Sequence, residues 1–270
     1  MSIFSSIILI TDRSKNIKET DTMKARSKKK FLIIFIVLAL LLITAVWYFQ
    51  FTKIGYIQSI PFRPEFQEIE NNVYLNKDNS LTPDEILEVT SEAKARVKNF
   101  YGDMQCLDNT MVVICDDKKI SDKIGEKDTT TFPFPTKKDY ICLSNEYFNV
   151  DVVAHEFTHA ELHSYISSDT QRNLPVWFDE GLATQNDYRE KYNYENWVKR
   201  TDNGKKATPL KDMDSYSEFQ SKDEDERQFH YLCAKHEIKE WLDKHSVQEL
   251  MELVKAVNDG EDFYVLYSQP

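Results

Sequence analysis

The 270-residue sequence lacks several features that would place it in a familiar class. Its four cysteines, Cys106, Cys115, Cys142 and Cys233, show no C-x-x-C spacing, which argues against a cysteine zinc site or a thioredoxin-like motif. They allow up to two disulfides in an oxidising compartment, or else free buried thiols. No repeat of solenoid period is apparent, and the length suits one ordinary domain plus an anchoring segment.

A basic stripe is also missing from the long C-terminal part. Residues 1–30 hold eight Lys/Arg and three Asp/Glu, so 26 of the 34 Lys/Arg and 42 of the 45 Asp/Glu lie in the remainder. The first part is therefore basic (+5) and the rest strongly acidic (−16). Because phosphate binding requires a basic surface, we expect no nucleic-acid partner.

One long uncharged run is present near the N-terminus. Residues 31–49, FLIIFIVLALLLITAVWYF, contain neither charge nor proline, and as a helix they nearly span a hydrocarbon core of about 30 Å. KARSKKK precedes this run and only Lys53 follows it closely, and the positive flank stays in the cytoplasm. We predict a basic cytoplasmic tail (1–30), a transmembrane signal-anchor helix (31–51) and an extracytoplasmic C-terminal part of a single-pass cell-membrane protein.

A cleaved signal peptide is the competing interpretation of this run. Its apolar core would be shorter and would end in small residues of the A-x-A kind, whereas this one ends in Trp47, Tyr48 and Phe49. An uncleaved anchor therefore fits better. Met23 opens a more usual anchor than Met1, so residues 1–22 are either a short tail or a misassigned start.

After the membrane segment we predict a connector (52–80) and one α+β domain (81–270). Prolines and the turn cluster NKDNS mark the connector. A helix follows, with Thr82 as N-cap, Glu85 closing a capping box and Gly102 as its stop. The β-branched segments TMVVIC and DYICLS predict strands, and TTTFPFPTKK between them predicts a loop.

From residue 149 onward the sequence predicts helices. Asn149 can cap a helix through DVVAHEFTHAELH (151–163), and Pro175 can start PVWFDEGLATQND. Further on, Ser246 and Glu249 form a second capping box. A small sheet followed by a mostly helical half is an α+β pattern.

The 151–163 segment contains a pattern with chemical meaning. His155 and His159 stand at i, i+4, which puts both imidazoles on one helix face, close enough to share one ion. Glu156 is rotated only about 100° from His155, so it can reach a water on that ion. This is H-E-x-x-H, the pattern of zinc peptidases. The alternative interpretation is a helix that carries two ordinary histidines and binds no metal.

A catalytic zinc needs a third protein ligand and one open position. LPVWFDEGLATQ, beginning some fifteen residues beyond the motif, offers Glu180, with Trp177 and Phe178 to dock its helix on the core. We expect Gly181 to permit close approach to the first helix. Asp179 is expected to point elsewhere as a solvated acid near the helix N-terminus, and His163, one turn after His159, to be a neighbour of the ligands or a surface residue.

HEFTH followed by WFDEGLA resembles the gluzincin metallopeptidases, specifically small peptidase MA-like domains, over about residues 82–265. The resemblance implies a zincin-like fold, Zn²⁺ held by His155, His159 and Glu180, and Glu156 as general base. The C-terminal helices show a weaker likeness to the same domains, which implies that Tyr231 supports the oxyanion, with His230 as the second candidate for this role. The alternative is that Tyr231 is only a core aromatic residue.

Two family features are absent from the sequence. Thr184 stands where thermolysin-like gluzincins have an acid four residues after the third ligand, so the partners of the histidines are not identified. The G-x-M-E-N motif that holds a free amine in gluzincin aminopeptidases is missing too. We therefore expect a membrane-anchored zinc endopeptidase acting on peptide or protein substrates outside the cytoplasm. In such domains a peptide usually lies along the edge strand beside the active-site helix, and DYICLS is the candidate edge strand.

Three other functions remain open from the sequence. The same zinc could hydrolyse another amide, for instance in a cell-wall peptide. A catalytically inactive peptidase-like binding or scaffold domain would keep the fold without turnover, although all four key residues are present. The apolar run could be a signalling element, but it has no internal charge and no glycine packing motif.

Overall fold

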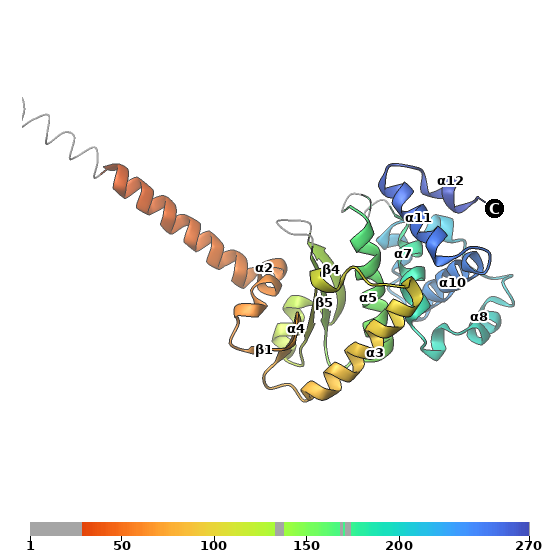
Figure 1. The fold of residues 1–270 in the computed structure, drawn as a ribbon, viewed down its shortest axis with the longest axis horizontal. Coiled ribbons are helices and arrows are strands. Elements are labelled where there is room, and N and C mark those ends of the chain that lie inside the picture. Colours follow the sequence, from red (N-terminus) through yellow and green to blue (C-terminus); the bar gives the residue numbers. More distant parts are fainter. Residues whose placement is uncertain (1–28, 133–137, 168–169, 171–173, 270) are drawn as a thin grey trace, which may run out of the picture. The chain divides into compact units, whose positions relative to one another are not determined.

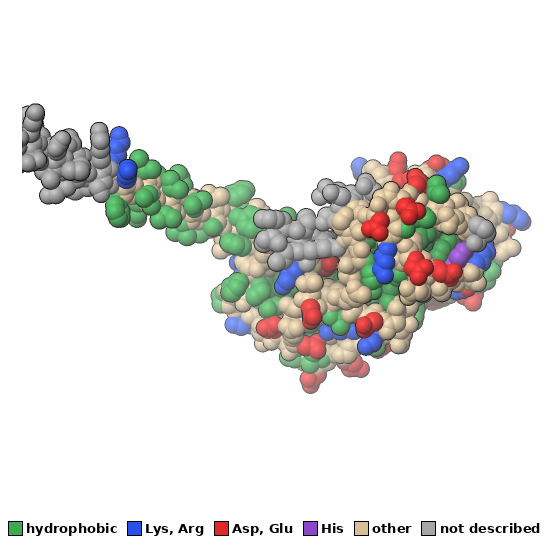
Figure 2. Space-filling model, turned by 45° about the horizontal axis from the view of Figure 1, so that its top comes forward, with side chains coloured by type: hydrophobic (Ala, Val, Ile, Leu, Met, Phe, Trp, Pro, Cys, Tyr) green, Lys and Arg blue, Asp and Glu red, His purple; other side chains and the backbone are tan. Residues whose placement is uncertain are grey.

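The computed structural model describes residues 29–132, 138–167, 170 and 174–269. The chain divides into two compact units between Gln58 and Ser59. The first unit contains an apolar helix, Lys29–Phe51, and a short helix α2, Lys53–Gln58. The apolar helix is long enough to cross a membrane, and none of its most apolar stretch is buried. This helix contains the predicted membrane-spanning residues 31–51. Figure 2 shows it covered with hydrophobic side chains, whereas the visible face of the second unit carries many charged ones.

The second unit is a mixed α+β structure, which confirms the α+β part of the predicted fold class (Figure 1). A five-stranded sheet has the order β1-β2-β3-β5-β4, with β2, β3 and β5 parallel and the outer strands antiparallel. The strands are β1 Phe66–Glu70, β2 Val73–Asn76, β3 Thr110–Ile114, β4 Lys127–Phe132 and β5 Lys138–Leu143. The helices of this half are α3 Pro83–Tyr101, α4 Lys118–Ile124 and α5 Val150–Tyr165.

The C-terminal half is helical, as predicted. Its helices are α7 Val176–Ala183, α8 Tyr194–Thr201, α9 Tyr216–Phe219, α10 Glu224–Leu242, α11 Val247–Asn258 and α12 Phe263–Tyr267, with 3-10 turns η3 Thr184–Asn186, η4 Glu190–Tyr192 and η5 Leu210–Asp212. Two large apolar cores result among the described residues, beside a smaller cluster of Tyr192, Trp197 and Leu232. One lies between the sheet and helices α3 and α5, and the other joins α7 to α10, α11 and α12.

The predicted helix ends are present. Thr82 accepts a hydrogen bond from the Glu85 amide while Glu85 accepts from the Thr82 amide, and Gly102 follows α3 at φ 87°, a value that favours glycine. Ser246 and Glu249 form the same reciprocal pair before α11. Local chemistry therefore fixes where these helices begin and end.

The sheet is larger than the sequence predicted. Strands β1 and β2 lie within residues 52–80, which were assigned to a connector, and Thr129–Phe132 belong to strand β4 rather than to a loop. β4 is the edge strand, so β5, expected at the edge, lies inside the sheet between β3 and β4. Proline excludes a central strand but is compatible with the end of an edge strand, which explains the error.

The four cysteines are free and buried, so the structure contains the thiol alternative and no disulfide between Cys106, Cys115, Cys142 and Cys233. Burial raises the pKa of the Cys115 thiol to about 11, and that of Cys106 rises further because Glu161 adds to the effect of burial. These thiols are therefore packing residues at neutral pH.

Candidate metal centre

Helix α5 presents His155 and His159 on one face. Asn149 caps the helix by accepting a hydrogen bond from the Val152 amide at 3.1 Å. The two imidazoles stand one turn apart, and their Nε2 atoms are 3.2 Å from each other. Both side chains are buried, at 2% and 9% exposed. The predicted convergence of the two histidines is therefore confirmed.

Helix α7 brings Glu180 to the same point. Its Oε2 lies 3.4 Å from His155 Nε2 and 3.4 Å from His159 Nε2, and the three residues form a group that could hold a metal ion. Ligand atoms placed tetrahedrally about 2.0–2.1 Å from one ion are about 3.3 Å apart. The three observed separations match that spacing, so the donors fit a zinc-sized ion.

Two atoms of this group are buried without a hydrogen bond in the described part of the chain, namely Glu180 Oε2 and His155 Nδ1. Burial opposes ionisation of Glu180, but the two neighbouring histidines lower the pKa of its carboxyl to about 2. A buried carboxylate oxygen without a donor is costly unless a cation satisfies it. This unsatisfied oxygen is a second, independent sign of a metal site.

No protein-family model matches the chain, and no curated protein sequence is significantly similar to it. The residues around the His155, His159 and Glu180 group come from the sheet edge and from both helical regions.

Asp179 does not point away as a solvated acid, which corrects the sequence prediction. Its Oδ1 lies 2.6 Å from His159 Nδ1, and its side chain is only 23% exposed. Burial opposes its ionisation, but His159 and His163 hold the pKa of Asp179 well below its usual range. Asp179 and Glu180 flank the His159 ring from consecutive positions, one at Nδ1 and the other near Nε2.

His163 is buried and continues this polar chain toward the sheet. Its Nδ1 lies 2.9 Å from Oδ1 of Asp139, a buried residue of β5, and its Nε2 lies 3.7 Å from Asp179 Oδ2. Burial opposes protonation of His163, but the two carboxylates raise its pKa. Of the two expected locations, beside the ligands or on the surface, the structure shows the first.

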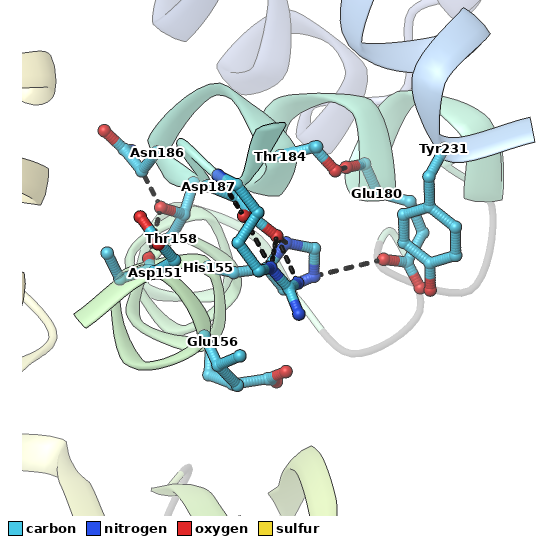
Figure 3. A network of polar contacts seen from close by, with 12 residues as sticks. Asp151, His155, Glu156, Thr158, Glu180, Thr184, Asn186, Asp187 and Tyr231 are labelled. Carbon is cyan, nitrogen blue, oxygen red and sulfur yellow. Dashed lines mark hydrogen bonds and ion pairs between the residues drawn. The ribbon is translucent and has the colours of Figure 1, made fainter. Parts of the chain in front are cut away.

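Asp187 places a carboxylate near His155. Thr184, which stands where thermolysin-like gluzincins have an acidic residue, has no carboxylate to offer. The α7 helix continues as a 3-10 turn, Thr184–Asn186, and the next residue, Asp187, is fully buried with Oδ2 4.0 Å from His155 Nδ1. Figure 3 shows His155 between Asp187 on one side and Glu180 on the other. Arg189 forms an ion pair with Asp187. Neither Asp187 nor Arg189 was identified from the sequence.

A polar network ties this turn to α3 and α5. Arg96 donates to Asp151 Oδ1 at 2.6 Å and to the Asn186 carbonyl at 2.9 Å, and Asn186 donates to Thr158 Oγ1 at 2.8 Å. These bonds hold the chain that follows Glu180 against α5. The fold itself therefore fixes the short distance between the Glu180 carboxylate and the two histidine rings.

Gly181 permits a close approach, but to a different helix from the one expected. A Cβ at this position would lie 2.7 Å from the Ala234 carbonyl oxygen of α10. Trp177 and Phe178, as predicted, are buried in the second core. Helix α7 is thus held between α5 and α10, and this packing aims Glu180 at the histidines.

Glu156 points into the cleft on the sheet side of the metal group. It is 4% exposed, and its Oε2 accepts a hydrogen bond from the Thr129 hydroxyl of the edge strand β4 at 2.5 Å. In Figure 3 its carboxylate lies apart from the His155 and Glu180 side chains. This placement suits a group that contacts a reacting water rather than a metal ligand. Thr129, which orients Glu156, was not identified from the sequence.

Tyr231 of α10 lies at the site, whereas His230 does not. The Tyr231 ring is 6.1 Å from the His155 ring, and Figure 3 shows its hydroxyl beside Glu180. Its hydroxyl accepts a hydrogen bond from Gln220 at 2.8 Å, and burial, with Glu180, raises the pKa of Tyr231 well above its usual value. His230 instead contacts the Phe219 carbonyl through Nδ1. Tyr231 is therefore a protonated donor within reach of the site.

The group opens into a cleft of about 750 Å³ between the sheet edge and the helical half. Its lining includes Lys127, Thr129, Glu156, Lys191, Tyr192 and Tyr231. Charged and polar side chains dominate its wall. A polar substrate that lies across the sheet edge is what such a cleft accommodates.

Removing the carboxylate of Asp179 tests its role beside His159. We expect Asp179→Asn to weaken zinc binding by about 10- to 100-fold, because partners of a metal-bound histidine fix its tautomer and raise its basicity. Competition with a chromophoric chelator measures the affinity. His163→Gln, one step further away, should have a smaller effect. Equal zinc affinity in the parent and Asp179→Asn proteins would show that Asp179 is only a packing residue.

Proposed function

We propose that the chain is a zinc-dependent metallopeptidase anchored in the cell membrane by residues 31–51, with its peptidase domain outside the cytoplasm. The carrying observation is the triangle of His155, His159 and Glu180 donor atoms, with sides of 3.2, 3.4 and 3.4 Å. Zinc is favoured among divalent ions because two imidazoles and one carboxylate with a further position open are a catalytic zinc donor set.

The arrangement around the triangle supports a zincin-like fold and peptide hydrolysis. An antiparallel edge strand, β4, borders helix α5, and a separate helix brings the third donor. The open edge of β4 can bind an extended peptide through main-chain hydrogen bonds. This assigns to β4 the substrate-binding role that the sequence suggested for DYICLS.

The chemistry divides among three kinds of group. When bound, zinc supplies Lewis acidity, which activates a water molecule near neutral pH and polarises the scissile carbonyl. Glu156 takes the proton of the attacking water and delivers it to the leaving amine. Thr129 holds that carboxylate in place, and the Tyr231 hydroxyl donates to the tetrahedral oxyanion. The reaction requires no covalent enzyme intermediate.

The membrane arrangement follows from charge. The span is preceded by five basic residues, Lys24, Arg26, Lys28, Lys29 and Lys30. A positively charged flank remains in the cytoplasm, so this end of the helix is expected to be the cytoplasmic one. The acidic remainder then lies outside. Protease protection of the C-terminal domain in closed cells or spheroplasts, compared with permeabilised ones, tests this orientation.

Chelation tests the function on the full chain in detergent. We expect about one zinc per chain by elemental analysis, and cleavage of peptides from a mixed library. Removal of the metal should abolish cleavage, and stoichiometric zinc should restore it, because the metal activates the attacking water. A folded protein that holds zinc yet cleaves nothing would favour the inactive binding or scaffold alternative. If the folded protein bound no zinc, the proposal that it is a zinc peptidase would be rejected.

A further inference from the structure

We propose that Lys127 and Lys191 form a carboxylate-binding subsite beside the reaction centre, so that the substrate is a peptide with an acidic group close to the scissile bond. The inference rests on the proposed peptidase function and adds to it the class of substrate. It is carried by the positions of the two lysines in the cleft and by the charges around them.

Lys127 lies on the edge strand that borders Glu156. It stands two residues before Thr129 on β4, so the two side chains project from the same face of the strand, about 7 Å apart. Thr129 contacts the Glu156 carboxylate directly. A peptide added to β4 therefore passes Lys127 within about two residues of the bond being cleaved.

Lys191 faces the same cleft from the helical half. It lies in the 3-10 turn Glu190–Tyr192, with Nζ 5.0 Å from the Tyr192 ring centroid. The Tyr192 ring is 6.0 Å from the Tyr231 ring, which is 6.1 Å from the metal-ligand candidate His155. A series of ring contacts thus leads from this ammonium group to the metal group, and both line the same cleft.

Neither ammonium group has a hydrogen bond or an ion pair in the described part of the chain, although both side chains are half-buried. The other charges of the cleft are engaged. Arg189 pairs with Asp187, Arg227 donates to the Ser221 carbonyl, Asp122 and Glu126 pair with Lys118, and Glu224 accepts from Gln228. Among the Lys and Arg residues that line the cleft, Lys127 and Lys191 are therefore the two whose head groups have no hydrogen-bond or ion-pair partner among the described residues.

The electrostatics of Lys191 agree with this reading. Burial lowers the pKa of its ammonium group, and Arg189 and Lys127 lower it further, against the opposite effect of Asp187 and Glu224. A bound carboxylate would reduce this repulsion between the two ammonium groups.

The carboxylate could belong to an Asp or Glu side chain or to the C-terminus of the peptide. Four matched peptides distinguish these two sources of the carboxylate. Each peptide carries either Glu or Gln near the cleavage site, and each of these two versions is made with a free and with an amidated C-terminus. The full chain in detergent is assayed for zinc content and for kcat/KM with each peptide. The same assays are made on Lys127→Met and Lys191→Met, and on Lys199→Met, an exposed lysine of α8 that does not line the cleft, as control.

We expect the carboxylate peptides to be preferred by about fivefold, a preference lost in each of the two cleft variants and weakened at high salt. Lys199→Met should keep it, and all proteins should keep their zinc. Preference for Glu in amidated peptides identifies a side-chain carboxylate, and dependence on the free C-terminus alone identifies the terminal one.

Two results would overturn the subsite, and they differ in what else they reject. A zinc-loaded parent that cleaves all four peptides equally, or a preference that survives in both cleft variants, rejects the lysine subsite and leaves the peptidase intact. A parent that holds no zinc and cleaves none of the peptides rejects the proposed function together with the inference.

Discussion

Replacing Glu156 with Gln is expected to lower kcat/KM by about 10³-fold or more while leaving zinc content and fold unchanged. The amide retains the shape of the side chain and its contact with Thr129, but it cannot accept the proton of the attacking water. Because Glu156 is not among the three donors of the candidate site, the metal should stay bound. Single-turnover cleavage of a fluorogenic peptide and elemental analysis of the same sample measure both quantities.

A milder change nearby provides the control. Thr129→Val removes the hydroxyl that holds Glu156 but keeps the carboxylate, so only a modest loss of about tenfold is expected. If Glu156→Gln kept a tenth of the parent activity, another group would be the base. If it lost zinc, Glu156 would support the metal rather than the proton transfer.

The parts of the fold set by local chemistry could be predicted from the sequence. The N-caps Thr82, Asn149 and Ser246 each satisfy free backbone amides with a neighbouring side chain, so their signals need no tertiary information. The i, i+4 spacing of His155 and His159 is equally local. Helix starts and the histidine pair therefore agreed with the structure.

Strand pairing depends on partners distant in the chain, and this is where the sequence prediction was wrong. β2 pairs in parallel with β3, some 40 residues later, and nothing local marks residues 73–76 as part of a sheet. The prolines after Phe132 suggested a loop, whereas the preceding threonines form the edge strand. Assigning the edge to β5 instead of β4 followed from that error.

The partners of the histidines show a missed local signal. Glu156 was expected to reach the site because consecutive helical residues are only about 100° apart, and the same argument applies to Asp179 beside Glu180. Asp187 could not be found in this way. It reaches His155 because the helix tightens into a 3-10 turn, and Arg96 ties that turn to α5.

Removing one donor of the candidate site should have the second large effect, on the metal rather than on the proton transfer. Zinc binding by a protein site is worth about 10–16 kcal/mol where it has been measured in small structural sites, so one of three donors contributes roughly 3–5 kcal/mol. Glu180→Gln and His159→Ala should therefore each weaken zinc binding by about 10³-fold, and activity at limiting zinc should fall with the affinity. Equilibrium dialysis against a zinc buffer measures this loss.

Glu180→Gln is the more informative of the two variants, because it keeps the volume and the packing of α7 on α5 and α10 while it removes the charge. His245→Gln, on a histidine that stacks on Trp241 away from the cleft, is the matched control and should bind zinc like the parent. In the zinc-free protein Glu180→Gln is expected to lower the melting temperature, because the pKa of the Glu180 carboxyl is lowered to about 2 and its charge beside the two histidines therefore stabilises the fold at neutral pH. Loss of zinc binding in a protein that is still folded at the assay temperature is what a metal ligand predicts. Unchanged zinc binding would mean that Glu180 only packs beside two ordinary histidines.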